Sequence, residues 1–241
     1  PTRIVEAPMR DARLTALIEK ALPKEGLAVR IRSEIPTGRG MGSSAALCVA
    51  MIRARHALEE RQASFDDIHQ EGFELEKLFH GTPSGIDHAV AAHGGALFYR
   101  KDQEPEILNM PPLQAVVLDS GSSGNTAKLV AHVADQRPRI DSALNQLGEL
   151  AEIGRSLLAD PEALGELMIE AHALLKMIGV STRVLDELVA LAMQHGAYGA
   201  KLSGAGGGGV VVALTPEDPD GLLQAALHRG IQAFSCTLPR P

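Results

Sequence analysis

Tryptophan is absent from this chain of 241 residues, and aromatic residues make up only 3% of it. With so few rings, the chain lacks the stacking platforms on which proteins bind single-stranded nucleic acid. The formal net charge of −7 also argues against a nucleic-acid-binding surface. We therefore expect no nucleic-acid partner, and any attraction for an anionic ligand has to come from local features such as loops and helix ends.

Cysteines and long apolar runs are equally scarce. The two cysteines, Cys48 and Cys236, stand far apart in the sequence and form no metal-ligand pair. A cysteine content this low is typical of the reducing cytoplasm, where we expect both residues to be small buried hydrophobes. No apolar run reaches the roughly 18 residues that a membrane helix needs. These absences predict a cytoplasmic protein without a membrane partner.

The overall composition is that of a globular protein. Hydrophobic residues make up 45% of the chain and charged residues 22%, which is an ordinary balance. The length allows one large domain or two modest ones. The segment 102–112 is polar and contains prolines, so it is the best candidate for a boundary. We predict one domain over residues 1–112 and a second over residues 113–241.

Hydrophobic periodicity and capping residues predict alternating helices and strands. Ser64 with Asp67 three residues later predicts a capped helix start, Asp160 before Pro161 predicts another, and Ser181 is expected to cap a third. The predicted helices cover residues 12–22, 45–59, 64–79, 144–158, 160–179 and 181–196, with a turn or helix over 215–230; the predicted strands cover 27–32, 96–99, 116–118, 210–214 and 231–238. Helices between two or three strands make the second half an α+β arrangement.

The most informative segment is a glycine-rich turn over residues 36–46, which reads Pro-Thr-Gly-Arg-Gly-Met-Gly-Ser-Ser-Ala-Ala. Glycine lets the backbone come close to a ligand, and the predicted helix that follows presents N–H groups and the positive end of its dipole. Together these features predict an anion site, most often one for phosphate. The turn lacks the Gly-Lys-Ser/Thr of a Walker loop and the spacing of the dinucleotide-binding fingerprint. A plain turn into a helix is the alternative.

Two further segments extend this pattern. Residues 80–87 read His-Gly-Thr-Pro-Ser-Gly-Ile-Asp, and residues 204–209 read Gly-Ala-Gly-Gly-Gly-Gly. Three such segments in this order resemble the GHMP kinases, with the first similar to their phosphate loop and the last to their C-terminal glycine motif. The middle segment resembles the mevalonate kinase branch of that family. The resemblance spans residues 26–238 and implies an α/β protein with a two-domain α+β fold, in which the first half is like ribosomal protein S5 and the second is ferredoxin-like.

The resemblance also implies roles for individual residues. Asp87 would be the catalytic aspartate, which accepts or orients the proton of the attacking alcohol, and Thr126 would lie near the transferred phosphoryl group. Ser44 and Glu76 would be ligands of Mg²⁺, which prefers oxygen. The residues expected to bind the nucleotide are Pro36, Gly38, Gly40, Met41, Gly42, Ser43, Ser44, Ala45, Gly204, Ala205, Gly206 and Gly207. The role of His88, which stands where relatives often have asparagine, is left open.

Each of these roles has a structural alternative. The serines could serve only as a helix N-cap, which needs no ligand. Glu76 could belong to a solvated helix face, Asp87 could cap a turn, and the glycine motif could be a flexible turn. The spacing of the residues does not decide between the two sets of interpretations, so the functional set rests on the resemblance.

The activity implied by the resemblance is that of an ATP- and Mg²⁺-dependent small-molecule kinase. The expected substrate is mevalonate, phosphorylated on its C5 hydroxyl in isoprenoid biosynthesis. One alternative is another kinase of the family that acts on a sugar or a phosphorylated heptose. A second alternative is a catalytically inactive member used for binding. The oligomeric state, a homodimer included, is left open.

One element of the family has no counterpart in this chain. GHMP kinases carry a first motif near the N-terminus, with a lysine on an early strand and loop, and nothing here resembles it. The chain also begins at Pro1 rather than at methionine. We therefore expect a truncated protein in which the strand over 27–32 lacks at least one neighbour. A minimal homologue is the alternative.

Overall fold

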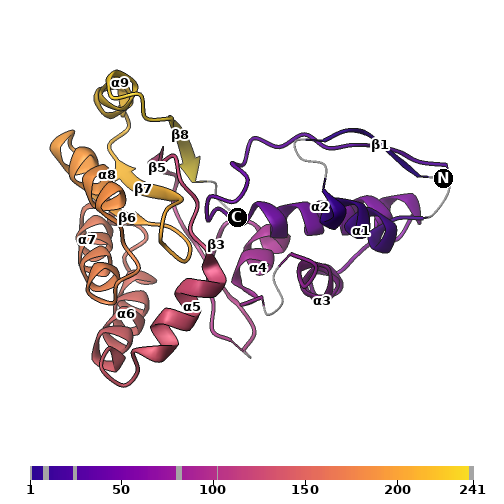
Figure 1. The fold of residues 1–241 in the computed structure, drawn as a ribbon, viewed down its shortest axis with the longest axis horizontal. Helices are drawn as coiled ribbons and strands as arrows, with labels where there is room; N and C mark the ends of the chain where they lie inside the picture. Colours follow the sequence, from indigo (N-terminus) through magenta and orange to yellow (C-terminus); the bar gives the residue numbers. More distant parts are fainter. Residues whose placement is uncertain (1, 8–10, 24–25, 80–82, 102, 239–241) are drawn as a thin grey trace. The chain divides into compact units, whose positions relative to one another are not determined.

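The computed structural model describes residues 2–7, 11–23, 26–79, 83–101 and 103–238. They form two compact units (Figure 1): the described residues within 1–38, 42–94 and 99–105 make the first, and those within 39–41, 95–98 and 106–241 make the second. The domain limits at residues 1–112 and 113–241 stay a prediction. Among the described residues, no helix combines the length and the apolar character that crossing a membrane requires.

Helices make up most of the first unit. In its described part they are α1 (Ala12–Ala21), α2 (Ser43–Leu58), α3 (Phe65–Glu76) and α4 (Ile86–His93). The side chain of Asp11 caps α1 by accepting the amide of Leu14, as a helix N-terminus requires. α2 supplies much of the core through Cys48, Val49 and Ile52, which pack with buried residues of α1 and α3. This packing fixes the start of α2, which carries the glycine-rich turn.

Two short strands accompany these helices. β1 (Arg3–Glu6) and β2 (Ala28–Arg30) pair in parallel, with Ile4 opposite Val29. β1 thus supplies one neighbour for the strand over 27–32, and the expectation that this strand lacks at least one further neighbour stays a prediction. A parallel pair needs a crossover between its strands, here through α1, so the pairing is not visible in the local pattern of four residues.

The second unit is built on a four-stranded antiparallel sheet. Its strands are β5 (Leu113–Asp119), β6 (Gly199–Leu202), β7 (Val210–Thr215) and β8 (Ala233–Leu238), in the order β6-β7-β5-β8. Helices α5 (Thr126–Asp135), α6 (Asp141–Gly154), α7 (Pro161–Met177) and α8 (Arg183–Gln194) connect β5 to β6, and α9 (Asp220–His228) connects β7 to β8. This connection and strand order are those of the expected ferredoxin-like half. A separate antiparallel pair is formed by β3 (Ala96–Phe98) and β4 (Glu106–Leu108).

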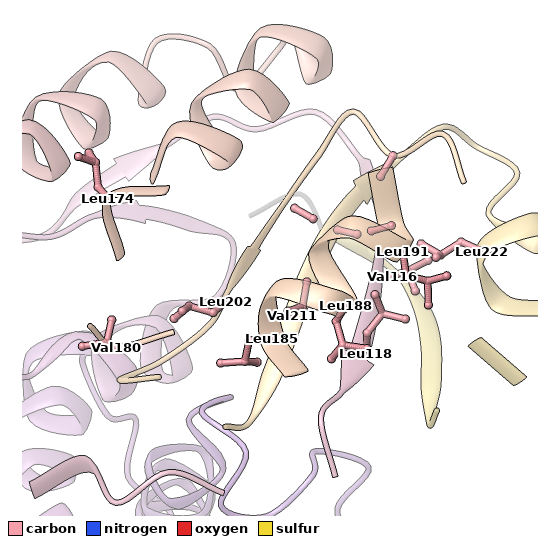
Figure 2. Packing of buried hydrophobic residues seen from close by; sticks show 14 of the residues in the cluster. Val116, Leu118, Leu174, Val180, Leu185, Leu188, Leu191, Leu202, Val211 and Leu222 are labelled. Atoms are coloured by element: carbon pink, nitrogen blue, oxygen red, sulfur yellow. The ribbon is translucent and has the colours of Figure 1, made fainter. Parts of the chain in front are cut away.

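One apolar core joins this sheet to its helices. Figure 2 shows Val116 and Leu118 of β5 among Leu185, Leu188 and Leu191 of α8, and all five side chains are buried. The spacing of the leucines puts them on one face of the helix, while alternate residues of β5 share one face of the sheet. Burial of each such side chain stabilises the fold by about 1.5–3 kcal/mol. The core therefore gives β6 and β7, which flank the glycine motif, a rigid base.

Most predicted elements are confirmed, with shifts at their ends. α2 begins at Ser43 rather than Ala45, and α3 ends at Glu76 rather than at about Phe79. The cap of α8 is Thr182, which accepts the amide of Leu185, and not Ser181. The hydroxyl of Ser181 instead donates to Asp186.

Several elements were not predicted. They are β1, β4, β6, α4 and α5, and β6 raises the sheet of the second unit to four strands instead of two or three. His80, Gly81 and Thr82 of the middle motif lie outside the described residues, as does Asp102 at the start of the predicted boundary segment.

Candidate active site

The start of α2 is a helix end without a side-chain cap. Its N-cap is Gly42, with φ 65° and ψ 25°, which makes no side-chain capping hydrogen bond. By contrast, α1, α3, α7 and α8 are each capped by an Asp, Ser or Thr side chain. Ser43 and Ser44 lie within the helix, so the alternative that they serve as caps is wrong. A helix start with glycine as its cap leaves room for an anion, which the helix dipole favours.

Asp87 lies against this helix start. It occupies the first turn of α4, directly after the N-cap Gly85 and Ile86. A Cβ atom added to Gly42 would lie 3.4 Å from Asp87 Cβ and 3.5 Å from Asp87 Cγ. The fold thus places the expected catalytic carboxylate beside the expected phosphate site. Because Asp87 is helical, the alternative that it caps a turn is wrong.

The turn that leads into α4 is fixed by Tyr99. The Tyr99 hydroxyl donates to the carbonyl of Ser84 over 3.2 Å. Gly85 has φ 95°, and a side chain on it would collide with the same hydroxyl, so only glycine fits. Sequence reasoning did not single out Tyr99, and nothing in its neighbourhood marks it.

Glu76 is buried and paired with His88. The carboxylate of Glu76 is 3% exposed and accepts a hydrogen bond of 2.9 Å from Nδ1 of the fully buried His88. The rings of Phe73 and His69 surround that histidine, with centroids 5.3 and 4.5 Å from its own. The alternative that Glu76 lies on a solvated helix face is therefore wrong. The sequence left the role of His88 open. This residue directly follows Asp87 in α4, and its hydrogen bond to Glu76 joins α4 to the end of α3.

The electrostatics of Cys48 locate Glu76 relative to α2. Burial raises the pKa of the Cys48 thiol to about 12, with a further contribution from the negative charge of Glu76. Ser44 stands one helical turn before Cys48, on the same face of α2. The charge of Glu76 thus acts on the helix that carries Ser44.

These two residues fit the donor chemistry of Mg²⁺, which takes one or two protein oxygens and completes its shell with phosphate and water. His88 engages one carboxylate oxygen of Glu76, Oε2, which leaves Oε1 for an ion. No group of three or more His, Cys, Asp or Glu side chains converges as a metal site within the described ranges. Ser44 and Glu76 therefore suit an ion that is bound mainly by phosphate and water better than an ion that is surrounded by protein ligands.

A cavity of about 680 Å³ opens beside the phosphate loop in the first unit. Its volume is typical of small-molecule sites. Ser43 and Ser44 line it at one end, and apolar side chains such as Leu47 and Ile31 form its walls. Arg13 lies in its lining with its guanidinium 5.8 Å from the centre of the Phe79 ring. The cavity thus offers apolar space next to an anion-binding helix end.

The glycine motif forms the loop between β6 and β7 in the second unit. Its backbone is held at both ends: the amide of Gly207 donates to Val180 over 2.8 Å and that of Gly209 to Ser122 over 2.7 Å. A side chain on Gly206 would collide with the Val180 carbonyl. These contacts hold the loop to neighbouring segments, and the role of the motif stays a prediction. Within the second unit, the hydroxyl of Ser203 donates to the carbonyl of Gly40 over 3.1 Å.

Thr126 lies at the start of α5, whose cap is the side chain of Asn125. It is exposed, and its role near the transferred group stays a prediction. Gly124, two residues earlier, packs so closely on Gly206 that a side chain there would collide with the Gly206 carbonyl. The start of α5 therefore lies beside the glycine loop.

The remaining predicted binding residues fall into the same two loops. In the first, they are Pro36, Gly38, Gly40, Met41 and, inside the helix, Ala45; in the second, they are Gly204, Ala205, Gly206 and Gly207. Sequence reasoning missed Arg39, whose Nε lies 3.3 Å from Asp119 Oδ2 at the end of β5. In the sequence, only the position of Arg39 within the phosphate loop pointed to this residue.

Comparison with known proteins identifies the family of the chain. The chain matches the family of GHMP kinases N terminal domains over residues 10–95 and that of GHMP kinases C terminal domains over residues 147–231. The mevalonate kinase of Thermococcus sibiricus is 41% identical over 220 residues, which cover 87% of this chain and 66% of the relative. The mevalonate kinase of Pyrococcus abyssi is 43% identical over 211 residues, which cover 83% of this chain and 63% of the relative.

A solved structure has the same fold. The crystal structure of L. major mevalonate kinase in complex with R-mevalonate superposes with a TM-score of 0.81 and 26% identity, covering 100% of this chain and 82% of that one. The chain spans slightly less than two thirds of the length of the two relatives named above. The sequence resemblance and the expected α/β fold are confirmed: the chain belongs to the GHMP kinase family and has the GHMP kinase fold.

Proposed function

We propose that the protein to which this chain belongs is an ATP-dependent mevalonate kinase, which transfers the γ-phosphoryl group of ATP to the C5 hydroxyl of mevalonate. The observation that carries the proposal is the position of Asp87 against Gly42 at the uncapped start of α2. A carboxylate beside this helix start supports a role for Asp87 in orienting an alcohol toward a phosphate bound there. The names of the similar archaeal proteins and of the similar structure support mevalonate as the alcohol.

The nucleotide has a natural place in the first unit. Its phosphates would bind the amides of the loop and the start of α2, from Gly40 to Ser44, with help from the helix dipole. Its base and ribose suit the adjoining cavity, which offers apolar walls and the ring of Phe79. The part assigned to Gly204–Gly207, in the second unit, rests on the family resemblance alone. Phosphoryl transfer needs mainly positioning and charge stabilisation, and these backbone features supply both.

Asp87 would orient the attacking hydroxyl and take its proton late in the reaction. An aspartate is a weak base, with an ordinary pKa of about 3.9, so it cannot deprotonate a free alcohol to any extent. The hydroxyl becomes acidic only as its oxygen bonds to phosphorus, and then a carboxylate within hydrogen-bond reach accepts the proton. Thr126 would contact the transferred group at this stage.

Ser44 and Glu76 would hold Mg²⁺ with the nucleotide. Charge on the β- and γ-phosphates is what the bound ion would neutralise. His88 keeps the carboxylate of Glu76 in place through its 2.9 Å hydrogen bond. The predicted domain limits at 1–112 and 113–241 and a cytoplasmic location, in keeping with the two free cysteines, belong to the same proposal.

The test is a substrate panel on the intact protein. ADP release is measured with mevalonate, phosphomevalonate, homoserine, galactose and a heptose phosphate, each with ATP and Mg²⁺. We expect mevalonate to give the highest kcat/KM. A higher value for a sugar would move the protein to another branch of the family, and ATP binding without turnover of any alcohol would identify an inactive member.

A further inference from the structure

A buried histidine lies behind the glycine loop. His172 of α7 is 7% exposed, and its Nδ1 atom accepts the backbone amide of Leu202 over 3.4 Å. Leu202 is the last residue of β6, so the next residue begins the loop. Because Nδ1 accepts, the ring proton of a neutral His172 is on Nε2. The sequence analysis did not single out this histidine.

Asp186 of α8 holds the other side of the ring. Nε2 of His172 donates to Asp186 Oδ1 over 3.1 Å, and the hydroxyl of Ser181 donates to the same oxygen over 2.7 Å. Lys176 pairs with the second carboxylate oxygen over 2.6 Å. The carboxylate thus fixes the tautomer and orientation of the imidazole from behind, as a second hydrogen-bond partner does for catalytic histidines.

The backbone of α7 brings His172 to the end of β6. Gly165 of α7 and Gly199 of β6 touch backbone to backbone, and a side chain on either would collide with the other segment. His172 follows Gly165 by two turns, about 10.5 Å along a helix. Leu202 follows Gly199 by about 10 Å along a strand. These two distances are nearly equal. The close contact of the two glycines at the start of β6 therefore brings His172 level with Leu202 at its end, where the hydrogen bond forms.

The same network reaches the far end of the loop. Val180, whose carbonyl accepts the amide of Gly207 over 2.8 Å, directly precedes Ser181, which is bonded to Asp186. The His172–Asp186 pair is therefore linked to the loop at Leu202 and at Gly207. A shift of this pair would move both ends of the segment that contacts Gly40 through Ser203.

The charges around the ring favour its neutral form. Burial lowers the pKa of His172, and the positive charges of Lys176 and Lys201 lower it further, while the hydrogen bond and charge of Asp186 oppose them. Burial alone would raise the pKa of Asp186, but hydrogen bonds from Lys176, Ser181 and His172 bring it below its usual value. A neutral ring beside an ionised carboxylate keeps Nδ1 available as an acceptor.

We propose that His172 and Asp186 are positioning residues that set the geometry of the glycine loop for phosphoryl transfer. They act through the amide of Leu202 and the turn at Val180, and neither touches a substrate. The inference rests on the proposed function for its catalytic part. Its structural part, the control of the loop by a single acceptor atom, stands independently of the substrate.

The test compares two replacements of His172 in the intact protein. In His172→Asn the side-chain oxygen can occupy the place of Nδ1 and accept the Leu202 amide, whereas in His172→Gln the polar group reaches the place of Nε2 and leaves that amide without its acceptor. We expect His172→Gln to lower kcat about 10-fold or more, since small misplacements of reacting groups are costly, and to speed hydrogen exchange at Leu202 and across the loop. His172→Asn should remain within about 3-fold of the parent in kcat, a far smaller loss than that misplacement causes.

His195→Gln is the matched control, because His195 is an exposed histidine at the end of α8. It should change neither kcat nor loop exchange. Equal kcat and equal exchange in His172→Gln and His172→Asn would overturn the proposal, whatever their melting temperatures. If the parent protein turns over no alcohol, the proposed function fails, and the exchange comparison still decides whether His172 holds the loop.

Discussion

Replacing Gly42 with alanine separates the geometry of the active site from the stability of the fold. Gly42 has φ 65° and ψ 25°, a left-handed conformation that costs alanine about 1–2 kcal/mol. The stiffer unfolded chain of the alanine variant offsets about 0.4–1 kcal/mol of this cost. We therefore expect the free energy of unfolding to fall by about 1 kcal/mol.

The effect on activity should be much larger than this loss. The new methyl group would lie 3.4 Å from Asp87 Cβ and 3.5 Å from Asp87 Cγ. These are ordinary contacts, so no clash adds to the strain, but the methyl group fills the space between the helix start and the carboxylate. A displacement of about 1 Å can lower a rate about 100-fold. We expect kcat/KM for mevalonate to fall at least about 10-fold.

Gly26→Ala is the matched control. Gly26 has φ 83°, and a Cβ atom on it would meet nothing within 4 Å. The same backbone strain should therefore lower the stability to a similar extent, with kcat/KM unchanged. Urea unfolding gives the first quantity and coupled ADP release the second. Equal kcat/KM in the two variants, or a loss of stability several times larger for Gly42→Ala, would refute the reasoning.

Three further predictions follow from the site and its surroundings. Ser44→Ala and Glu76→Gln should each raise the Mg²⁺ concentration that gives half-maximal rate, and an unchanged Mg²⁺ titration in both variants would remove these ligands from the proposal. Because burial raises the pKa of Cys48 to about 12, iodoacetamide at pH 8 should label Cys236 first, as mass spectrometry can follow; equal rates would contradict this. Since the pKa of His172 is lowered from 6.5, its contribution to stability is complete above about pH 6.5 and is lost as the pH falls below it. Between pH 7.5 and 5.5, the free energy of unfolding measured with urea should therefore fall less in His172→Asn than in the parent. Equal decreases in the two proteins would contradict this role of His172.

Local signals in the sequence predicted those elements whose ends are made by their own residues. The capping box of Ser64 and Asp67 is present in the structure, and so is the Asp160 cap before a proline at the first helical position. In both cases the stabilising hydrogen bond joins residues three positions apart, so the pattern is complete within a short window.

Elements that depend on distant partners were missed. α4 has eight residues and begins at a glycine without a side-chain cap, so its start resembles a turn. The Ser181 hydroxyl donates to Asp186, which explains why the cap of α8 moves to Thr182. The parallel pair of β1 and β2 is likewise set by a contact across α1.

The candidate site divides in the same way. The motifs predicted roles for Asp87, Ser44 and Glu76, because each residue occupies a position of the family pattern to which the resemblance assigns a role. The partners that hold such residues, such as His88 and Tyr99, come together only in the folded chain. A histidine that follows the predicted catalytic aspartate gives no sign that it bonds to a glutamate of the preceding helix.

The most direct test of the account is the rate of phosphoryl transfer in Asp87→Asn. The matched control is Asp66→Asn, because Asp66 is exposed and is the second residue of α3, as Asp87 is of α4. Both changes remove a negative charge from the first turn of a helix in the same unit. Single-turnover measurements with ATP and mevalonate, together with nucleotide binding, compare the two variants in the intact protein. We predict a loss of at least about 100-fold for Asp87→Asn with unchanged nucleotide affinity and a normal rate for Asp66→Asn. A folded Asp87→Asn variant with a near-normal rate would contradict the central claim that this carboxylate acts on the alcohol.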